Sequence, residues 1–109
     1  MQISIRCVHE AAIFDISGDI DLANSPEVRK ALLHEVRDNR RSRVVLNLSE
    51  VRYIDSSGVA SLVESLKASR DIGSRFILVG LSGPAREVLQ LSRLLKVFEI
   101  YDTEVEALA

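Results

Sequence analysis

The sequence predicts an α/β fold: a mostly parallel central sheet of four to five strands with an antiparallel N-terminal strand, and about four helices. Short apolar segments alternate with segments whose apolar residues recur at three- and four-residue steps, the order of strand followed by helix. Two of the apolar segments, 44–48 and 76–79, show no polar alternation, which is typical of strands covered on both faces. We expect residues 1–109 to form one domain.

The N-terminal segment predicts an antiparallel hairpin. Two period-two segments lie on either side of a short break at His9 and Glu10. In the first, Ile3, Ile5 and Cys7 alternate with Ser4 and Arg6; in the second, Ala12, Phe14 and Ile16 alternate with Ile13 and Asp15. We expect residues 18–21, Gly-Asp-Ile-Asp, to leave the second strand as a loop.

A first helix is expected to follow this loop. Asn24 or Ser25 caps it, and Pro26 is its first residue, where a proline loses no hydrogen bond. One stripe of the helix is apolar: Val28, Ala31, Leu32 and Val36. The polar residues expected to face water are Arg29, Lys30, Glu35 and Arg37.

A central strand and a long helix are expected next. The strand covers 44–48, and the helix runs from about Ser56 to Ile72. Gly73 follows at the position where a left-handed residue commonly ends a helix. The handover between strand and helix therefore lies close to Asp55.

A third helix and two short elements are expected to complete the chain. The helix opens at Gly83 and Pro84, after the strand at 76–79. Its apolar residues are expected to be Val88, Leu89 and Leu95. Residues 97–100 predict a short last strand, and 104–108 predict a terminal helical turn.

Composition excludes several classes of function. A net charge of −2 gives little reason to expect direct binding of nucleic acid. The longest apolar runs are only about four residues, whereas a membrane span needs about 20, so we expect no span. The absence of a signal-peptide pattern, together with the single cysteine, favours a cytoplasmic location.

The sequence shows no metal or cofactor pattern. His9 and His34 have no Cys or second His at ligand spacing. Asp19 and Asp21 lack the third carboxylate of a calcium loop. We therefore expect no metal and no cofactor.

The candidate functional site is the turn at 55–60. Asp55 and Ser56 are both good N-cap residues, and the first-turn backbone N–H groups after them have no partner inside the helix. These donors and the helix dipole favour negative charge, so a serine hydroxyl there is a suitable position for a phosphate. By spacing alone, an ordinary helix cap is the better interpretation.

Four segments resemble the STAS domain of bacterial anti-sigma factor antagonists, the partner-switching regulators. They are 18–21 (GDID), 45–48 (VLNL), 53–58 (YIDSSG) and 91–98 (LSRLLKVF), and the Asp-Ser-Ser-Gly phrase is the specific part. The resemblance covers nearly the whole chain and reverses the preference for an ordinary cap. One departure is Arg93, because similar proteins often have glycine after the preceding serine.

The resemblance implies a regulatory binding protein, not an enzyme, with no catalytic residue. Its unphosphorylated form would bind an anti-sigma factor with serine kinase activity and release the sigma factor. Phosphorylation at Ser56 would abolish that binding, and a serine phosphatase would restore it. The residues expected to contact the partner are Asp21, Asn24, Asp55, Ser57 and Gly58.

A phosphate on Ser56 is expected to be held by the helix opening, so that the fold survives it. Its charge, close to Asp55 and Asp21, would spoil an interface that buries the neutral hydroxyl.

Other functions and assemblies remain open at this stage. Similar STAS domains act as accessory subunits of membrane lipid transporters and dock on the ATPase subunit, so this is the alternative function. A hydrolase is less favoured, because neither histidine lies near a serine in the sequence. Weak self-association is also left open, and the sequence does not specify the sigma factor.

Overall fold

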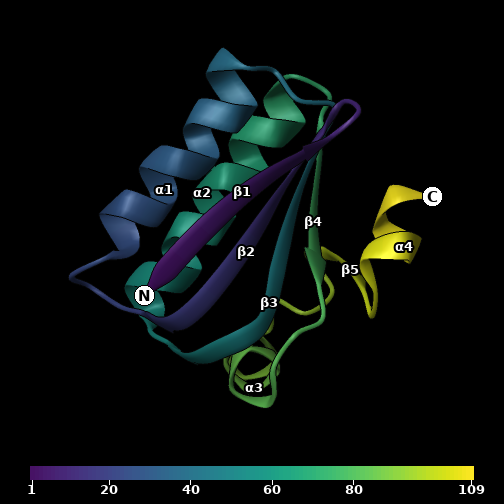
Figure 1. Cartoon of the computed structure of the whole chain (residues 1–109). Coiled ribbons are helices and arrows are strands. Elements are labelled where there is room, and N and C mark those ends of the chain that lie inside the picture. The colour runs from purple at the N-terminus through teal and green to yellow at the C-terminus, as the bar shows by residue number, and fades with distance from the viewer.

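A five-stranded sheet forms the centre of the molecule, with strand order β1-β2-β3-β4-β5 (Figure 1). The computed structural model describes residues 1–109. The strands are β1 (Gln2–Val8), β2 (Ala11–Ile20), β3 (Arg43–Ile54), β4 (Arg75–Val79) and β5 (Glu99–Tyr101). β1 pairs antiparallel with β2, and all the other neighbours are parallel. The predicted sheet, with its antiparallel N-terminal strand, is confirmed.

The helices lie on both sides of this sheet. They are α1 (Ser25–Leu33), the π-helical turn η1 (His34–Asp38), α2 (Ser56–Asp71), α3 (Gly83–Leu91) and α4 (Glu104–Leu108). Figure 1 shows α1 and α2 side by side against one face, α4 on the other face, and α3 at one end of the sheet. None of these helices has the length and apolar character needed to cross a membrane.

The central strands are buried on both faces, as the uninterrupted apolar segments predict. Leu46 and Leu78 belong to a cluster of 20 buried residues beneath α1 and α2. Val45 and Ile77 point the other way, into a cluster of five that includes Ala107 of α4. Because each face of the strands has its own cover, no position had to be polar.

β2 and β3 are longer than predicted. We expected a loop at 18–21 and a strand end at Leu48, but the two strands stay paired as far as Ile20 and Ile54. Register shifts interrupt the pairing, and Gly18 adopts φ +93° at one of them. Only some residues in this extension are buried, and polar residues lie between them. The extension therefore lacks the regular apolar pattern that predicts a strand.

Glu35 does not face water as predicted. The chain widens into η1 after Leu33, and both Glu35 and Val36 are buried. The Glu35 carboxylate accepts hydrogen bonds from Arg41 Nε at 2.9 Å and Asn39 Nδ2 at 3.0 Å. The wider turn brings Glu35 inward, and these two donors satisfy its charge.

The third helix ends earlier than predicted. α3 stops at Leu91, so Leu95 lies outside it and packs against the core from the following segment. Arg93, the position of the expected glycine, adopts φ +60°. The backbone N–H of Leu94 donates to the Leu89 carbonyl at 2.8 Å, which closes the helix end.

Candidate functional site

The candidate site lies where β3 hands over to α2, beside the end of β2 (Figure 1). The backbone N–H of Asp55 donates to the Ile20 carbonyl at 3.1 Å, which fixes the turn to the neighbouring strand. The turn is therefore held by β3, which leads into it, and by the neighbouring end of β2.

Asp55 is the N-cap of α2. Its Oδ1 accepts from the backbone N–H groups of Ser57 at 3.0 Å and Gly58 at 3.1 Å, and from the Ser57 hydroxyl. Its Oδ2 accepts from the backbone N–H of Leu22 at 3.1 Å, across to the loop after β2. The hydrogen bond from the Ser57 hydroxyl, and those from the backbone N–H groups of Gly58, Leu22 and Ser57, lower the pKa of Asp55.

This cap changes the surroundings that we expected for a phosphate on Ser56. The free N–H groups that we expected to receive an anion at Ser57 and Gly58 are already bound by the Asp55 carboxylate. A phosphate on Ser56 would therefore lie beside a carboxylate and without those donors. The helix start would therefore do little to balance its charge.

Ser56 is the first residue of α2 and is exposed. Its hydroxyl takes no part in the hydrogen bonds of the cap, in contrast to the Ser57 hydroxyl, which donates to Asp55. The turn therefore presents one serine to solvent and uses the other for its own structure.

Asp21 and Asn24 build the neighbouring loop. Asn24 Oδ1 accepts from the Asp21 backbone N–H at 2.9 Å, and Asn24 Nδ2 donates to the Asp19 carbonyl at 2.7 Å. Asp21 Oδ1 accepts from the Ala23 backbone N–H at 3.1 Å. Asn24 is the N-cap residue of α1, but its side chain bonds this loop and not the helix. The two residues thus lie near Asp55 in a loop held by its own side chains.

Gly58 is buried under the turn. A Cβ at this position would lie 2.7 Å from Ile54 Cγ1 and 2.8 Å from Ile20 Cγ2. The backbone of α2 therefore packs tightly against the strand ends at this residue. Of the five predicted contact residues, this one has a packing role and is not open to a partner's side chain.

Two exposed apolar residues beside the turn were missed from the sequence. Leu22 is 76% exposed and Tyr53 is 52% exposed, and both belong to segments that contact Asp55 or lead into it. Large exposed apolar side chains near a polar centre are typical of protein interfaces. The available signal was an apolar residue inside the polar segment 18–25.

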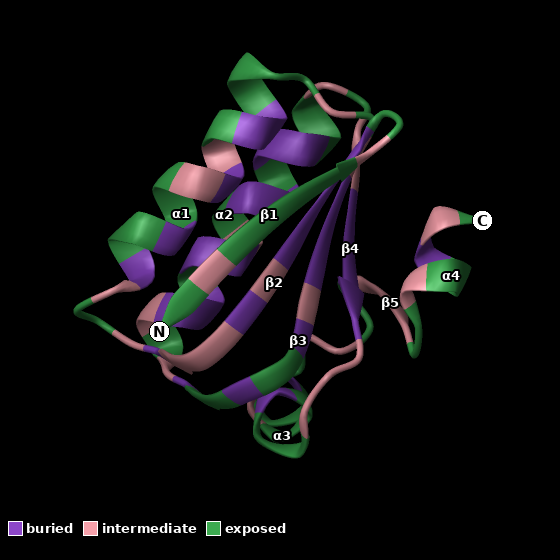
Figure 2. Ribbon diagram, in the orientation of Figure 1, coloured by how far each residue is buried: buried purple, intermediate pink, exposed green.

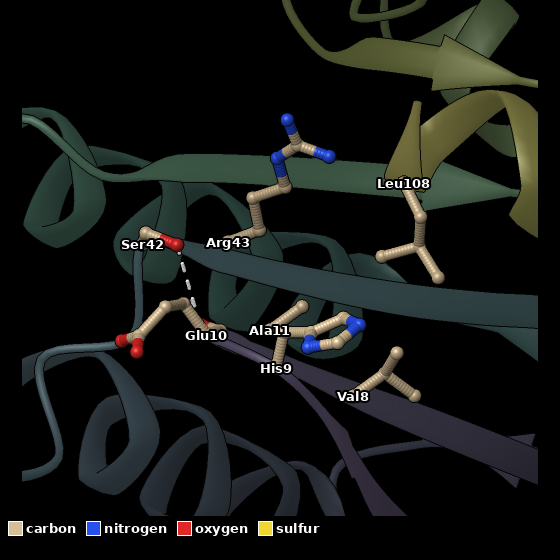
Figure 3. A pocket seen from close by; sticks show the side chains of 7 residues that line it. All are labelled: Val8, His9, Glu10, Ala11, Ser42, Arg43 and Leu108. Carbon is tan, nitrogen blue, oxygen red and sulfur yellow. Dashed lines mark hydrogen bonds between the residues drawn. The ribbon is translucent and has the colours of Figure 1, made fainter.

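A hollow of about 230 Å³ lies at the other end of the sheet, near the β1–β2 turn (Figure 3). The Ser42 hydroxyl there donates to the Glu10 carbonyl at 3.3 Å. Figure 3 shows His9 apart from that hydroxyl, so His9 and Ser42 do not form a pair of base and nucleophile.

Fold and site together define a class of protein: a small α/β domain that presents a serine on a firmly capped strand-to-helix turn at its surface. The family model for the STAS domain matches residues 2–107. The chain belongs to the STAS domain family.

Named relatives agree with the resemblance in the sequence. The Anti-sigma F factor antagonist of Paenibacillus polymyxa is 28% identical over 108 residues, 99% of this chain and 92% of that protein. The Anti-sigma-B factor antagonist of Listeria monocytogenes is 32% identical over 92 residues, 84% of this chain and 79% of that protein. A crystal structure of an anti-sigma factor antagonist from Mycobacterium paratuberculosis superposes with a TM-score of 0.85 at 26% identity, covering 98% of this chain and 90% of that one.

Proposed function

We propose that this protein is an anti-sigma factor antagonist controlled by phosphorylation of Ser56. The unphosphorylated form binds an anti-sigma factor that is also a serine kinase, and the sigma factor is released. Phosphorylation breaks the complex, and a serine phosphatase restores it. The names of the relatives support the class of partner.

The observation that carries this proposal is the contrast between Ser56 and Ser57. Ser56 is exposed at the first position of α2, whereas the Ser57 hydroxyl is bound to Asp55. A kinase can reach the first hydroxyl without breaking the cap, but it would have to disrupt the cap to reach the second. The geometry therefore favours Ser56 as the acceptor.

The same turn supplies a physical basis for the switch. A phosphate adds about −1.5 to −2 charges at neutral pH. It would lie next to Asp55, whose carboxylate binds the backbone N–H of the exposed Leu22, at a surface where a partner can bury a neutral hydroxyl and apolar side chains. A loss of about 3 kcal/mol at that interface weakens binding by roughly a hundredfold.

The test is phosphorylation by the anti-sigma factor kinase encoded in the same genome. We expect ATP and this kinase to add one phosphate, mapped by mass spectrometry to Ser56 and absent from Ser56→Ala. Ser57→Ala is the matched control and should still be phosphorylated. Phosphate on another residue would contradict the proposal. Absence of phosphorylation together with binding to a transporter ATPase would support the accessory-subunit alternative instead.

A further inference from the structure

β1 forms an open edge of the sheet. It pairs only with β2, and nothing covers its other side (Figure 1). Most of its seven residues are exposed (Figure 2). A strand edge of this kind carries unpaired backbone N–H and C=O groups that can pair with another strand.

The edge lacks the features that usually prevent such pairing. β1 has no proline and no lysine, and its seven residues pair with β2 without a register shift. Its one charged residue, Arg6, is bound on the α4 side of the sheet by Asp15 at 2.7 Å and Glu104 at 2.6 Å. The only charge on the strand is therefore paired with carboxylates on one face of the sheet, and it does not hinder pairing of another strand with this edge.

We propose that β1 pairs antiparallel with β1 of a second copy of this chain, about a two-fold axis through Ile5. Ile5 is the middle residue of the strand and is 45% exposed, so this register pairs the full length and buries the two Ile5 side chains against each other. Ser4 then lies opposite Arg6, and Ile3 lies opposite Cys7. Centring the pair on Arg6 would instead place two guanidinium groups face to face.

Charges on α1 fit the same axis. A groove beside Ile5 is lined mainly by α1 and η1, and three charged residues on it, Glu27, Lys30 and Arg37, form no ion pair. β1 and α1 run in the same general direction (Figure 1), so the two-fold axis makes the two α1 helices antiparallel. The Glu27 end of each copy then meets the Arg37 end of the other, which gives two matched contacts of opposite charge.

The proposed dimer leaves the candidate site free. The axis crosses the middle of β1, whereas Ser56 lies at the end of the sheet where β3 finishes. The two Ser56 residues therefore lie at opposite ends of the joined sheet. Self-association and partner binding are separable, and each is tested without the other.

Sedimentation velocity of the full chain tests the interface. We expect a concentration-dependent monomer–dimer equilibrium between about 1 µM and 1 mM, which corresponds to about 4–8 kcal/mol of binding free energy. Ile5→Lys should weaken the dimer at least tenfold. Leu91→Lys adds the same charge at another exposed apolar residue and should not weaken it. A monomer throughout that range, or equal effects of the two variants, would overturn the proposal.

Two further variants test the register and the charges without disturbing the strand. Ile3→Cys should form an intermolecular disulfide with Cys7 under a mild oxidant such as diamide, because the two positions are opposite. Ser4→Cys, which points to the other face, and the unaltered chain should not. Glu27→Arg and Arg37→Glu should each weaken the dimer, and the double variant should restore it. Equal crosslinking of the two cysteine variants, or no rescue, would overturn this register.

Discussion

At the scale of single residues, Asp55 does more than begin a helix. Its two carboxylate oxygens bind α2 on one side and the loop after β2 on the other. One side chain therefore sets both the start of the helix and the position of Leu22. Loss of the carboxylate should loosen the whole surface around Ser56.

The first prediction concerns this carboxylate. Asp55→Ala should lower the free energy of unfolding by about 1–2 kcal/mol, because the N-cap acceptor is lost. Asp55→Asn keeps an acceptor and should cost less. Urea unfolding of the three proteins at neutral pH measures both differences.

The pH dependence of this stabilisation has a definite sign. The folded pKa of Asp55 is lowered, so its ionised form stabilises the fold above the ordinary value of about 3.9. That contribution is lost as the pH falls through the folded pKa. The stability advantage over Asp55→Asn should therefore shrink below about pH 4, and pH profiles that stay parallel for the two proteins would contradict this account.

The second prediction concerns Gly58. Gly58→Ala should destabilise the fold by about 1–3 kcal/mol, because the added Cβ overlaps Ile54 and Ile20. Gly83→Ala is the control: nothing lies within 4 Å of its added Cβ, so no overlap is expected there. Thermal unfolding should show a clear loss of stability for Gly58→Ala and a much smaller change for Gly83→Ala. Equal effects would show that the contact at Gly58 is not limiting.

At the scale of elements, the sequence predicts best those helices and strands whose signals lie within the element itself. The strand at 44–48 is recognisable because both of its faces are covered, and α2 because Asp55 caps it and Gly73 ends it. The extension of β3 to Ile54 was missed, because its pairing across a bulge depends on the neighbouring strand. Glu35 was misplaced for a similar reason, since its burial depends on Arg41 and Asn39.

The third prediction belongs to the end of α3. Arg93 adopts φ +60°, a conformation that costs an ordinary residue about 1 kcal/mol relative to glycine. Arg93→Gly should therefore raise the free energy of unfolding by about 0.5–1 kcal/mol. Arg86→Gly, an exposed position inside the same helix, should lower it by a similar amount. A loss of stability in Arg93→Gly would show that the Arg93 side chain makes a contact that stabilises the fold by more than the backbone conformation costs.

At the scale of the whole molecule, residues distant in sequence complete the structure. Arg6 of β1 joins Asp15 of β2 and Glu104 of α4, so the two ends of the chain meet over one face of the sheet. The candidate site also uses such contacts, and only part of it can be recognised from the local sequence. Asp55 and Ser56 are recognisable locally, but the exposure of Leu22 and Tyr53 emerges only once the strands are assembled.

The last prediction joins the site to the whole fold and rests on the proposed function. Ser56→Asp should lower affinity for the anti-sigma factor at least tenfold, because a charge enters the contact surface beside Asp55. The fold should survive, since Ser56 is exposed and its hydroxyl makes no contact that the cap needs. Titration calorimetry measures the affinity, and thermal unfolding of the free protein measures the stability of the fold.

Ser56→Asn is the matched uncharged control and should bind more tightly than Ser56→Asp. Equal affinities for the two variants would refute the electrostatic mechanism, whereas a large fall in the unfolding temperature of Ser56→Asp would show that the turn itself rejects the charge.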